Sequence, residues 1–341
     1  MGTNQDEYTP STPLEEVERG VEANNADALC ELAWRYRHGE GGVKRNDRKA
    51  FLLFERASKL GSTVGLNNLA LCYSDGIGVE RDQTAACRSY RKAAELGDMN
   101  ALNNLGNCYL NGLGVKQNPR AAFRTFLKAA EHGCAAAQNN LAFCYLRGTG
   151  VDKDPVKATR WFEKAVECGS AEAMINLSWC YQTGQGGKVD LEKALEVLER
   201  ARADGLMIAS NNLAYMYRHG FGVEQSHERA FEYYQEAARV DFPESVVALA
   251  ECYEHGLGTP QNLYMAAKTY ERAAALGDIR GVIKRRELEK KLKKRFDRPL
   301  SGQDDRESPL DLVALSDAKL DAQRLGRESA EGEEPEKKEN E

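Results

Sequence analysis

A repeat of thirty-six residues constrains this chain more than any other feature of its sequence. Glycines recur at this interval and mark the ends of successive units: Gly61, Gly97, Gly133, Gly169, Gly205 and Gly277. A fixed period of this length is typical of a solenoid, in which each unit packs against its neighbours in the stack. The 341 residues can therefore fold as a row of small units without a single globular core.

Each unit begins with an apolar stripe at helical spacing. In residues 98–133 the stripe contains Leu102, Leu105 and Tyr109, and Gly106 leaves room for a neighbouring helix. The leucine recurs as Leu32, Leu69, Leu105, Leu141, Leu177, Leu213 and Leu249, and the tyrosine as Tyr36, Tyr73, Tyr109, Tyr145, Tyr181, Tyr217 and Tyr253. A Gly-x-Gly turn follows, which we interpret as a helix stop and not a phosphate loop, because no strand precedes it.

The second half of each unit predicts a capped helix. Residue types whose side chains accept the free N–H groups of a first helical turn recur there: Asn46, Asp82, Asn118, Asp154, Asp190, Ser226 and Asn262. Beyond each cap, alanine and then an aromatic residue or leucine recur at fixed offsets, so that large side chains can pack against small ones. The sequence therefore predicts an all-α solenoid of seven helix-turn-helix repeats over residues 26–277.

The full pattern is A-x-x-x-L-G-x-x-Y-x-x-G-x-G-V followed by K-A-x-x-x-F-x-K-A-A-x-x-G. It resembles the Sel-one-like repeat family, relatives of the tetratricopeptide repeats with a longer loop between the two helices. The resemblance implies a right-handed superhelix with the first helices on its concave side, and an adaptor that assembles other proteins. Three departures stand out: Glu40 lengthens the first loop, residues 185–188 lack the usual valine, and Asp241 replaces a closing glycine, which predicts a bend.

The ends of the chain differ from the repeats. We expect a disordered arm over residues 1–13, a capping helix over 14–25, a basic capping helix over 278–298, and a disordered acidic tail over 299–341. The apolar face of the basic helix is predicted to contain Ile279, Val282, Ile283, Leu288 and Leu292. Its lysines and arginines indicate either the solvated side of a cap, which we favour, or a nuclear import or anionic-surface signal. Within the tail, SPLDLVALSDAKLDAQRL could form a short helix on a partner.

Targeting signals are weak. No run approaches the roughly 18 apolar residues of a membrane span, and the first twenty residues lack the pattern of a secretory signal. We therefore expect a soluble cytoplasmic protein, with a nuclear or membrane-peripheral location as alternatives. Gly2 follows Met1 as in a myristoylation signal, but Asp6 stands where a hydroxyl residue is usual. Acylation of Gly2 together with the basic helix defines one alternative function, a membrane-associated adaptor.

Cysteines and histidines give no support to catalysis. Five of the nine cysteines occupy one repeat position: Cys72, Cys108, Cys144, Cys180 and Cys252. Neighbouring helix axes lie about 8–10 Å apart, beyond the roughly 7 Å that a disulfide tolerates between Cα atoms, so we predict small buried thiols. No zinc-type C-x-x-C pair, Ser/His/Asp arrangement or phosphate loop occurs. The sequence predicts a protein with no enzymatic activity, cofactor, metal or small-molecule substrate.

Function is expected at positions that the repeat does not need. Two such positions on each first helix are predicted to face a groove: the residue two before the repeat leucine and the residue two after it. The earlier position contains Asn67, Asn103, Asn139 and Asn211. The later position contains Trp34, Asn107, Phe143, Trp179 and Tyr215. Asparagines can hydrogen-bond an extended peptide, and large aromatic residues supply anchors. Alternatively, these side chains pack between adjacent first helices. The neighbouring Asn68, Asn104, Asn140, Asn176 and Asn212 are expected to satisfy groups inside the fold.

Net charge bears on the class of partner. The chain has a formal charge of −6, and the predicted groove is not lined with lysine or arginine. Proteins that bind nucleic acid neutralise phosphates with such side chains. Because the predicted groove lacks them, a nucleic-acid-associated repeat protein is only the second alternative. The preferred prediction is a non-catalytic scaffold that binds a protein partner of unknown identity.

Overall fold

A computed structural model describes residues 12–296, with side chains to residue 292. Gly2 and the acidic tail lie outside these residues. Within the described part, every regular element is a helix. The helices are α1 (Leu14–Glu22), α2 (Ala26–His38), α3 (Asp47–Lys59), α4 (Thr63–Asp75), α5 (Gln83–Glu95), α6 (Met99–Asn111), α7 (Pro119–Glu131), α8 (Ala135–Arg147), α9 (Pro155–Glu167), α10 (Ala171–Thr183), α11 (Leu191–Ala203), α12 (Met207–His219), α13 (His227–Ala238), α14 (Pro243–His255), α15 (Leu263–Ala275) and α16 (Ile279–Phe296).

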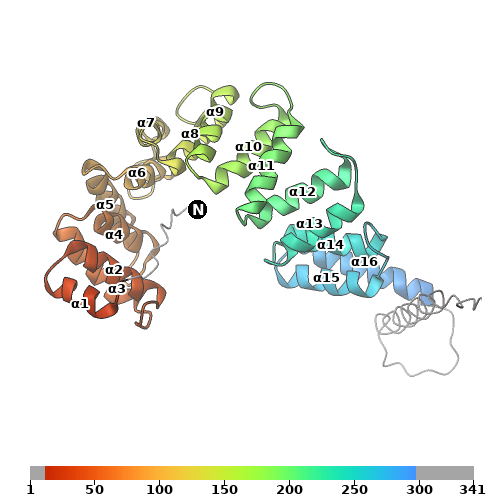
Figure 1. The fold of residues 1–341 in the computed structure, drawn as a ribbon, viewed down its shortest axis with the longest axis horizontal. Helices are drawn as coiled ribbons and strands as arrows, with labels where there is room; N and C mark the ends of the chain where they lie inside the picture. The colour runs from red at the N-terminus through yellow and green to blue at the C-terminus, as the bar shows by residue number, and fades with distance from the viewer. Residues whose placement is uncertain (1–11, 297–341) are drawn as a thin grey trace, which may run out of the picture. The chain divides into compact units, whose positions relative to one another are not determined.

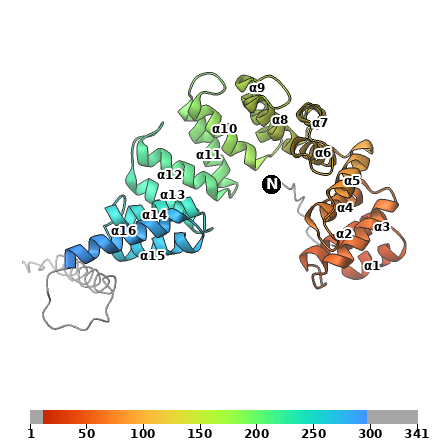
Figure 2. The ribbon, with the colours of Figure 1, turned by 180° about the vertical axis from the view of Figure 1, so that it is seen from behind.

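The helices follow one another as hairpins, as Figures 1 and 2 show from opposite sides. The chain divides into two compact units, of which the first ends at Asp190 and the second begins at Leu191. In the first unit, α2 to α9 form four hairpins, and each hairpin packs on the next. In the second unit, α12 packs on α13, α14 on α15, and α16 on α15. The predicted all-α solenoid is confirmed, and the handedness of its superhelix stays a prediction.

One backbone bond closes the loop of every repeat. In the third repeat the N–H of Asn118 donates to the carbonyl of Tyr109 at 2.8 Å, and the equivalent bond in all seven repeats measures 2.7–3.0 Å. The side chain of Asn118 then accepts the N–H of Ala121 at 3.0 Å, which caps α7. The same side-chain cap is present at Asn46, Asp82, Asp154, Ser226 and Asn262. The tyrosine and the cap therefore fix the angle at which the chain re-enters a helix.

In four of the seven repeats the two loop glycines serve different purposes. Gly112 ends α6 in the left-handed conformation, with φ of 70°. Gly114 also has a positive φ, but a side chain there would place its Cβ 2.0 Å from the carbonyl oxygen of Gln83 in the preceding repeat. At Gly78, Gly150 and Gly258 an added Cβ would likewise lie 2.0–2.1 Å from a backbone carbonyl oxygen of the preceding repeat. The first glycine therefore permits the turn, and the second permits adjacent repeats to touch through their backbones.

The core alternates large and small side chains. Phe126 of α7 is fully buried, and a Cβ at Gly106 would lie 2.5 Å from its ring. Aromatic or leucine side chains fill the same position in the other repeats, at Phe54, Tyr90, Phe162, Leu198, Tyr234 and Tyr270. Alanines that are 0–2% exposed surround them. Each such side chain contributes roughly 1.5–3 kcal/mol by burial, so stability is distributed evenly along the stack.

The sixth repeat shows how a missing glycine is accommodated. Asp241 takes the left-handed conformation that glycine has elsewhere, with φ of 56°. The guanidinium of Arg272 donates to its carboxylate at 2.9 and 2.6 Å and to the carbonyl of Ala238 at 2.5 Å. Aspartate is among the few residues that tolerate this conformation, and the arginine holds it in place. The turn thus keeps its conformation without glycine.

A buried cation ties the N-terminal end together. Arg35 stands where five of the six later repeats have the buried cysteine, and its side chain is 1% exposed. Its guanidinium donates to the carbonyl of Thr12 at 2.6 Å and pairs with the carboxylate of Glu31. Val17 of α1 is buried beside α2. The N-terminal segment is therefore part of the packed structure from Thr12 onward.

At the other end, α16 covers the last repeat. Leu288 and Leu292 are each 2% exposed. The predicted apolar face was wrong in part, because Ile279 and Ile283 are 69% and 50% exposed. Four of the helix's cations form ion pairs: Arg280 with Asp278, Lys284 with Glu287, Arg285 with Glu271 and Glu289, and Lys291 with Glu254. The helix is bound through both leucines and charge pairs.

Candidate partner-binding surface

The aromatic side chains after the repeat leucine differ in how much surface they offer. Trp179 of α10 is 45% exposed. Phe143 of α8 is half-buried and meets Phe162 edge to face, with the ring centres 5.3 Å apart. Trp34 of α2 is also half-buried and lies 4.4 Å from the ring of His38. In the first unit, Trp179 is therefore the strongest candidate for an anchor that a partner could cover.

In the second unit the same position carries an exposed group of three rings. Tyr215 of α12 lies 4.4 Å from His219 and 5.7 Å from Phe221, and the latter two are 5.6 Å apart. Tyr215 is 49% exposed and Phe221 45%. We call Tyr215, His219 and Phe221 the aromatic cluster. Phe221 was not predicted, although its place as the middle residue of a Gly-x-Gly turn, which varies among repeats, could have indicated it.

The asparagines at the earlier position have a different environment from the predicted groove. Asn103 and Asn139 are 4% and 6% exposed. The Oδ1 of Asn103 accepts the Nδ2 of Asn140 at 2.8 Å, and that of Asn139 accepts the Nδ2 of Asn176 at 2.9 Å. Neither side chain has enough free surface to bind the backbone of a peptide, so Asn103 and Asn139 do not belong to the candidate partner-binding surface.

Two further asparagines take part in contacts between repeats. The Oδ1 of Asn67 accepts the Nδ2 of Asn104 at 3.2 Å. Asn211 accepts the hydroxyl of Ser245 at 2.8 Å. Asn107, at the later position, is half-buried. The asparagines therefore join successive first helices, which agrees with the alternative that these side chains pack between adjacent first helices.

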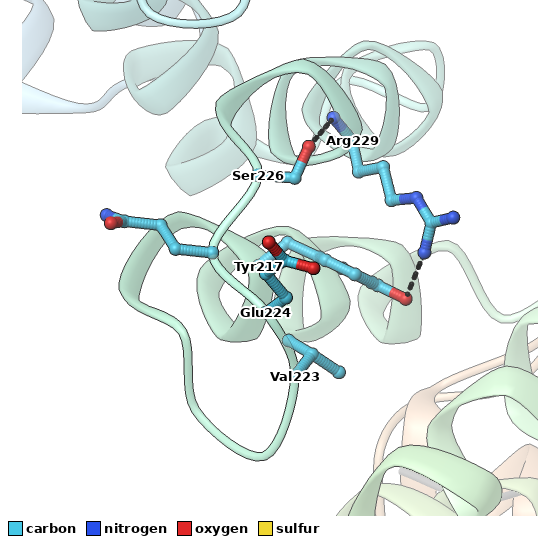
Figure 3. A pocket seen from close by; sticks show the side chains of 6 residues that line it. Tyr217, Val223, Glu224, Ser226 and Arg229 are labelled. Carbon is cyan, nitrogen blue, oxygen red and sulfur yellow. Dashed lines mark hydrogen bonds between the residues drawn. The ribbon is translucent and has the colours of Figure 1, made fainter.

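A hollow of about 500 Å³ opens beside Tyr217 (Figure 3). Val223, Glu224 and Ser226 line it from the loop, and the guanidinium of Arg229 donates to the tyrosine hydroxyl at 3.1 Å. An equivalent hollow of about 430 Å³ lies in the third repeat, between Tyr109, Asn118 and the first turns of α7. Because the repeat geometry produces both, neither is by itself a specific site.

A third hollow, of about 440 Å³, lies between α6 and α8. Phe143 and Cys144 form part of it, and Asn111, Gln117 and Arg147 line it with polar groups. The guanidinium of Arg147 stands over the ring of Phe143, 5.2 Å from its centre. This combination suits a partner side chain with an apolar stem and a polar end, and it adds Arg147 to the candidate surface.

The remaining chemistry of the described residues is structural. The five repeat cysteines are buried and free, as predicted, and burial raises the pKa of the Cys144 thiol to about 11. The carboxylate of Glu163 accepts the hydroxyl of Tyr181 at 2.8 Å, and burial followed by this bond raises the pKa of that phenol. In the part of the chain that the structure describes, no group of three or more His, Cys, Asp or Glu side chains could hold a metal ion. Nor is any helix there long and apolar enough to cross a bilayer.

Sequence models of known families match this chain seven times. The matching model is that of the Sel1 repeat, over residues 26–62, 63–98, 100–134, 135–170, 171–206, 208–241 and 243–278. The chain belongs to the Sel1 repeat family. The Sel1 fold is typical of non-catalytic scaffolds for protein–protein interaction. No curated protein matches the chain closely enough to count as a relative.

Solved Sel1 repeat structures resemble this one. A protective antigen of uropathogenic Escherichia coli with an SLR fold superposes with a TM-score of 0.67 at 26% identity, over 91% of this chain and 65% of that protein. The chain thus spans less than two thirds of that relative's length. A Sel1 repeat protein of Oxalobacter formigenes gives a TM-score of 0.63 at 27% identity, over 81% of this chain and 79% of that one.

Proposed function

We propose that this protein is a non-catalytic scaffold that binds a protein partner through exposed aromatic side chains on its first helices and on the loops that follow them. The observation that carries the proposal is the aromatic cluster, in which Tyr215 and Phe221 are 49% and 45% exposed although both pack against His219. Stacked rings of this kind lose little conformational entropy on binding and offer a large apolar area. Trp179 supplies a second anchor at the equivalent position of another repeat.

The class of partner follows from the chemistry of these positions. Aromatic residues and arginine dominate the energy of protein interfaces, and Arg147 lies over Phe143 at the same level of the fourth repeat. Sel1 and tetratricopeptide-like repeats typically bind proteins, which agrees with this chemistry.

Affinity capture with the full chain tests the proposal. The Trp179→Ala/Tyr215→Ala variant should lose the partners that the wild-type chain retains, because truncation of an interface anchor typically costs about 2 kcal/mol or more. A Leu60→Ala/Leu96→Ala variant serves as the matched control, since these leucines are 50% and 53% exposed but lie outside the aromatic positions. Capture of the same partners in equal amounts by both variants would remove the proposal.

The cellular location and the two alternative functions, a membrane-associated adaptor and a nucleic-acid-associated protein, are further proposals. Nine free cysteines suit a reducing compartment such as the cytoplasm. Membrane association would need the cations of α16, of which Lys284, Arg285 and Lys291 already pair with carboxylates. These pairs reduce the charge that the helix can offer to anionic lipid or to nucleic acid.

A further inference from the structure

On one face of the second helices, the exposed charges are positive on α5, α7 and α9 and negative on α11 and α13. The second and sixth residues after each cap lie four apart and therefore on one face of the helix. In the first unit this face carries Arg88 on α5, Arg120 and Arg124 on α7, and Arg160 on α9. In the second unit it carries Glu192 and Glu196 on α11, and Glu228 and Glu232 on α13, whereas α15 has the exposed Lys268 at this position. We call these the basic face and the acidic face.

Most charges on the two faces have no ion-pair partner in the described part of the protein, although Arg229 lies close enough to Glu232 to attract it. All eight side chains are exposed. Among the described residues, the four arginines and Glu192, Glu196 and Glu232 make no hydrogen bond or ion pair, while Glu228 accepts only the hydroxyl of Ser226, at 3.1 Å. Nearby charges do pair, for example Arg202 with Glu199 and Glu236, and Lys157 with Asp154. The basic face and the acidic face therefore consist of charges that found no ion-pair partner among neighbouring side chains.

The two faces also match in spacing. Both are built on the same repeat, so the distance between charges along a helix is the same, about 6 Å for four residues. The distance between successive second helices follows the same repeat geometry in each unit. A row of cations from one face can therefore stand opposite a row of anions from the other without a change in either backbone.

We propose that the basic face of one copy binds the acidic face of a second copy of this chain. Each copy carries both faces, so α7 and α9 of one copy can lie against α11 and α13 of a second. A second copy fits better than nucleic acid, because the chain itself supplies the matching row of carboxylates and its formal net charge of −6 disfavours a phosphate backbone. This surface is separate from the aromatic positions, so its test does not depend on the partner proposed above.

Sedimentation of the full chain at low and high salt gives the first measurement. We expect a dimer at low salt that weakens at least about tenfold when the salt is raised from about 0.05 to 0.5 M, because exposed charges are screened over shorter distances. A chain that stays monomeric at low salt up to about 100 μM would overturn the proposal, since the attraction between the two oppositely charged faces is strongest at low salt. A dimer that is indifferent to salt would overturn it as well.

Charge reversal identifies the two faces. The variant Arg124→Glu/Arg160→Glu removes the net positive charge of the basic face and places two glutamates opposite the acidic face, and Glu196→Arg/Glu232→Arg does the converse, so each variant alone should be monomeric. Mixed in equal amounts they should form a heterodimer, because every reversed charge again meets its opposite. Failure of the mixture to associate would overturn the proposal. The Glu95→Arg/Glu131→Arg variant changes exposed anions on α5 and α7 outside the faces and should dimerise as the wild type does.

Discussion

The ammonium group of Lys291 on α16 lies 2.9 Å from one carboxylate oxygen of Glu254 on α14. The hydroxyl of Tyr270 on α15 donates to the other oxygen at 2.9 Å. The Glu254 side chain is only 7% exposed, and burial alone would raise its pKa. The bonds from Lys291 and Tyr270 outweigh burial and hold the pKa of Glu254 below its ordinary value of 4.5. One buried carboxylate thus joins three helices at the C-terminal end.

This geometry makes the stability of the last repeat dependent on pH. Because the pKa of Glu254 is lower in the folded state, its contribution is complete above about pH 4.5 and is lost as the pH falls through the folded-state pKa. Glu254→Gln should therefore lower the free energy of unfolding by about 1–2 kcal/mol at neutral pH, and the difference from wild type should shrink toward pH 3. Urea unfolding at several pH values measures both quantities.

A second carboxylate provides the control for that experiment. Glu271 pairs with Arg285 of the same helix α16, but its side chain is 60% exposed. Glu271→Gln should change stability by less than about 1 kcal/mol, since surface ion pairs contribute little. If the effect of Glu254→Gln were the same at pH 7 and at pH 3, the carboxylate would not be charged in the folded protein and the interpretation would be wrong.

The two kinds of glycine should respond differently to alanine. Gly97 and Gly114 have φ of 96° and 69°, so alanine at either place costs roughly 1–2 kcal/mol of backbone strain. Around Gly97 no atom lies within 4 Å of an added Cβ, whereas at Gly114 the carbonyl of Gln83 would be 2.0 Å away. Gly114→Ala should therefore unfold at clearly lower denaturant concentration than Gly97→Ala. Equal midpoints would show that adjacent repeats can separate at little cost.

The asparagine contacts predict a further difference. Asn140→Ala leaves the Oδ1 of the buried Asn103 without its 2.8 Å donor. An unsatisfied buried acceptor costs about 1–3 kcal/mol, so this variant should be destabilised by that amount in thermal or chemical unfolding. Asn68→Ala is the matched control, because its Nδ2 donates only to the carbonyl of Val64 in its own helix. The assignment fails if the two variants are equally stable.

The fold could be predicted because each repeat restates the same local rules. Tyr109, Asn118 and the Gly-x-Gly turn each have a role within one hairpin, and that role is visible in sequence spacing alone. The asparagine contacts could not be predicted in the same way. The partner of Asn103 is Asn140, thirty-seven residues later, and their contact depends on how closely two first helices approach.

The candidate surface was predicted only in part for a similar reason. Periodicity indicates which positions vary, and it selected Trp179 and Tyr215, which are exposed. It does not indicate that Phe221, in a loop, folds back onto Tyr215. The sign change between Arg124 and Glu196 is visible in the sequence, but its meaning depends on both residues being exposed and unpaired, which only the structure shows.

Thiol reactivity offers a test of the burial of the cysteines. Among the nine cysteines only Cys168 is exposed, and burial raises the pKa of Cys72, Cys144 and Cys252 to about 11. A thiol reagent attacks the thiolate, which is scarce at neutral pH when the pKa is that high. We expect one thiol to react rapidly in the native protein and the other eight only after unfolding, as measured by absorbance with a disulfide reagent.

Cys168→Ser should abolish the rapid phase, whereas Cys134→Ser, which removes a thiol that is 7% exposed, should leave it intact. A rapid phase of several thiols would mean that the repeats open in solution far more often than their packing indicates.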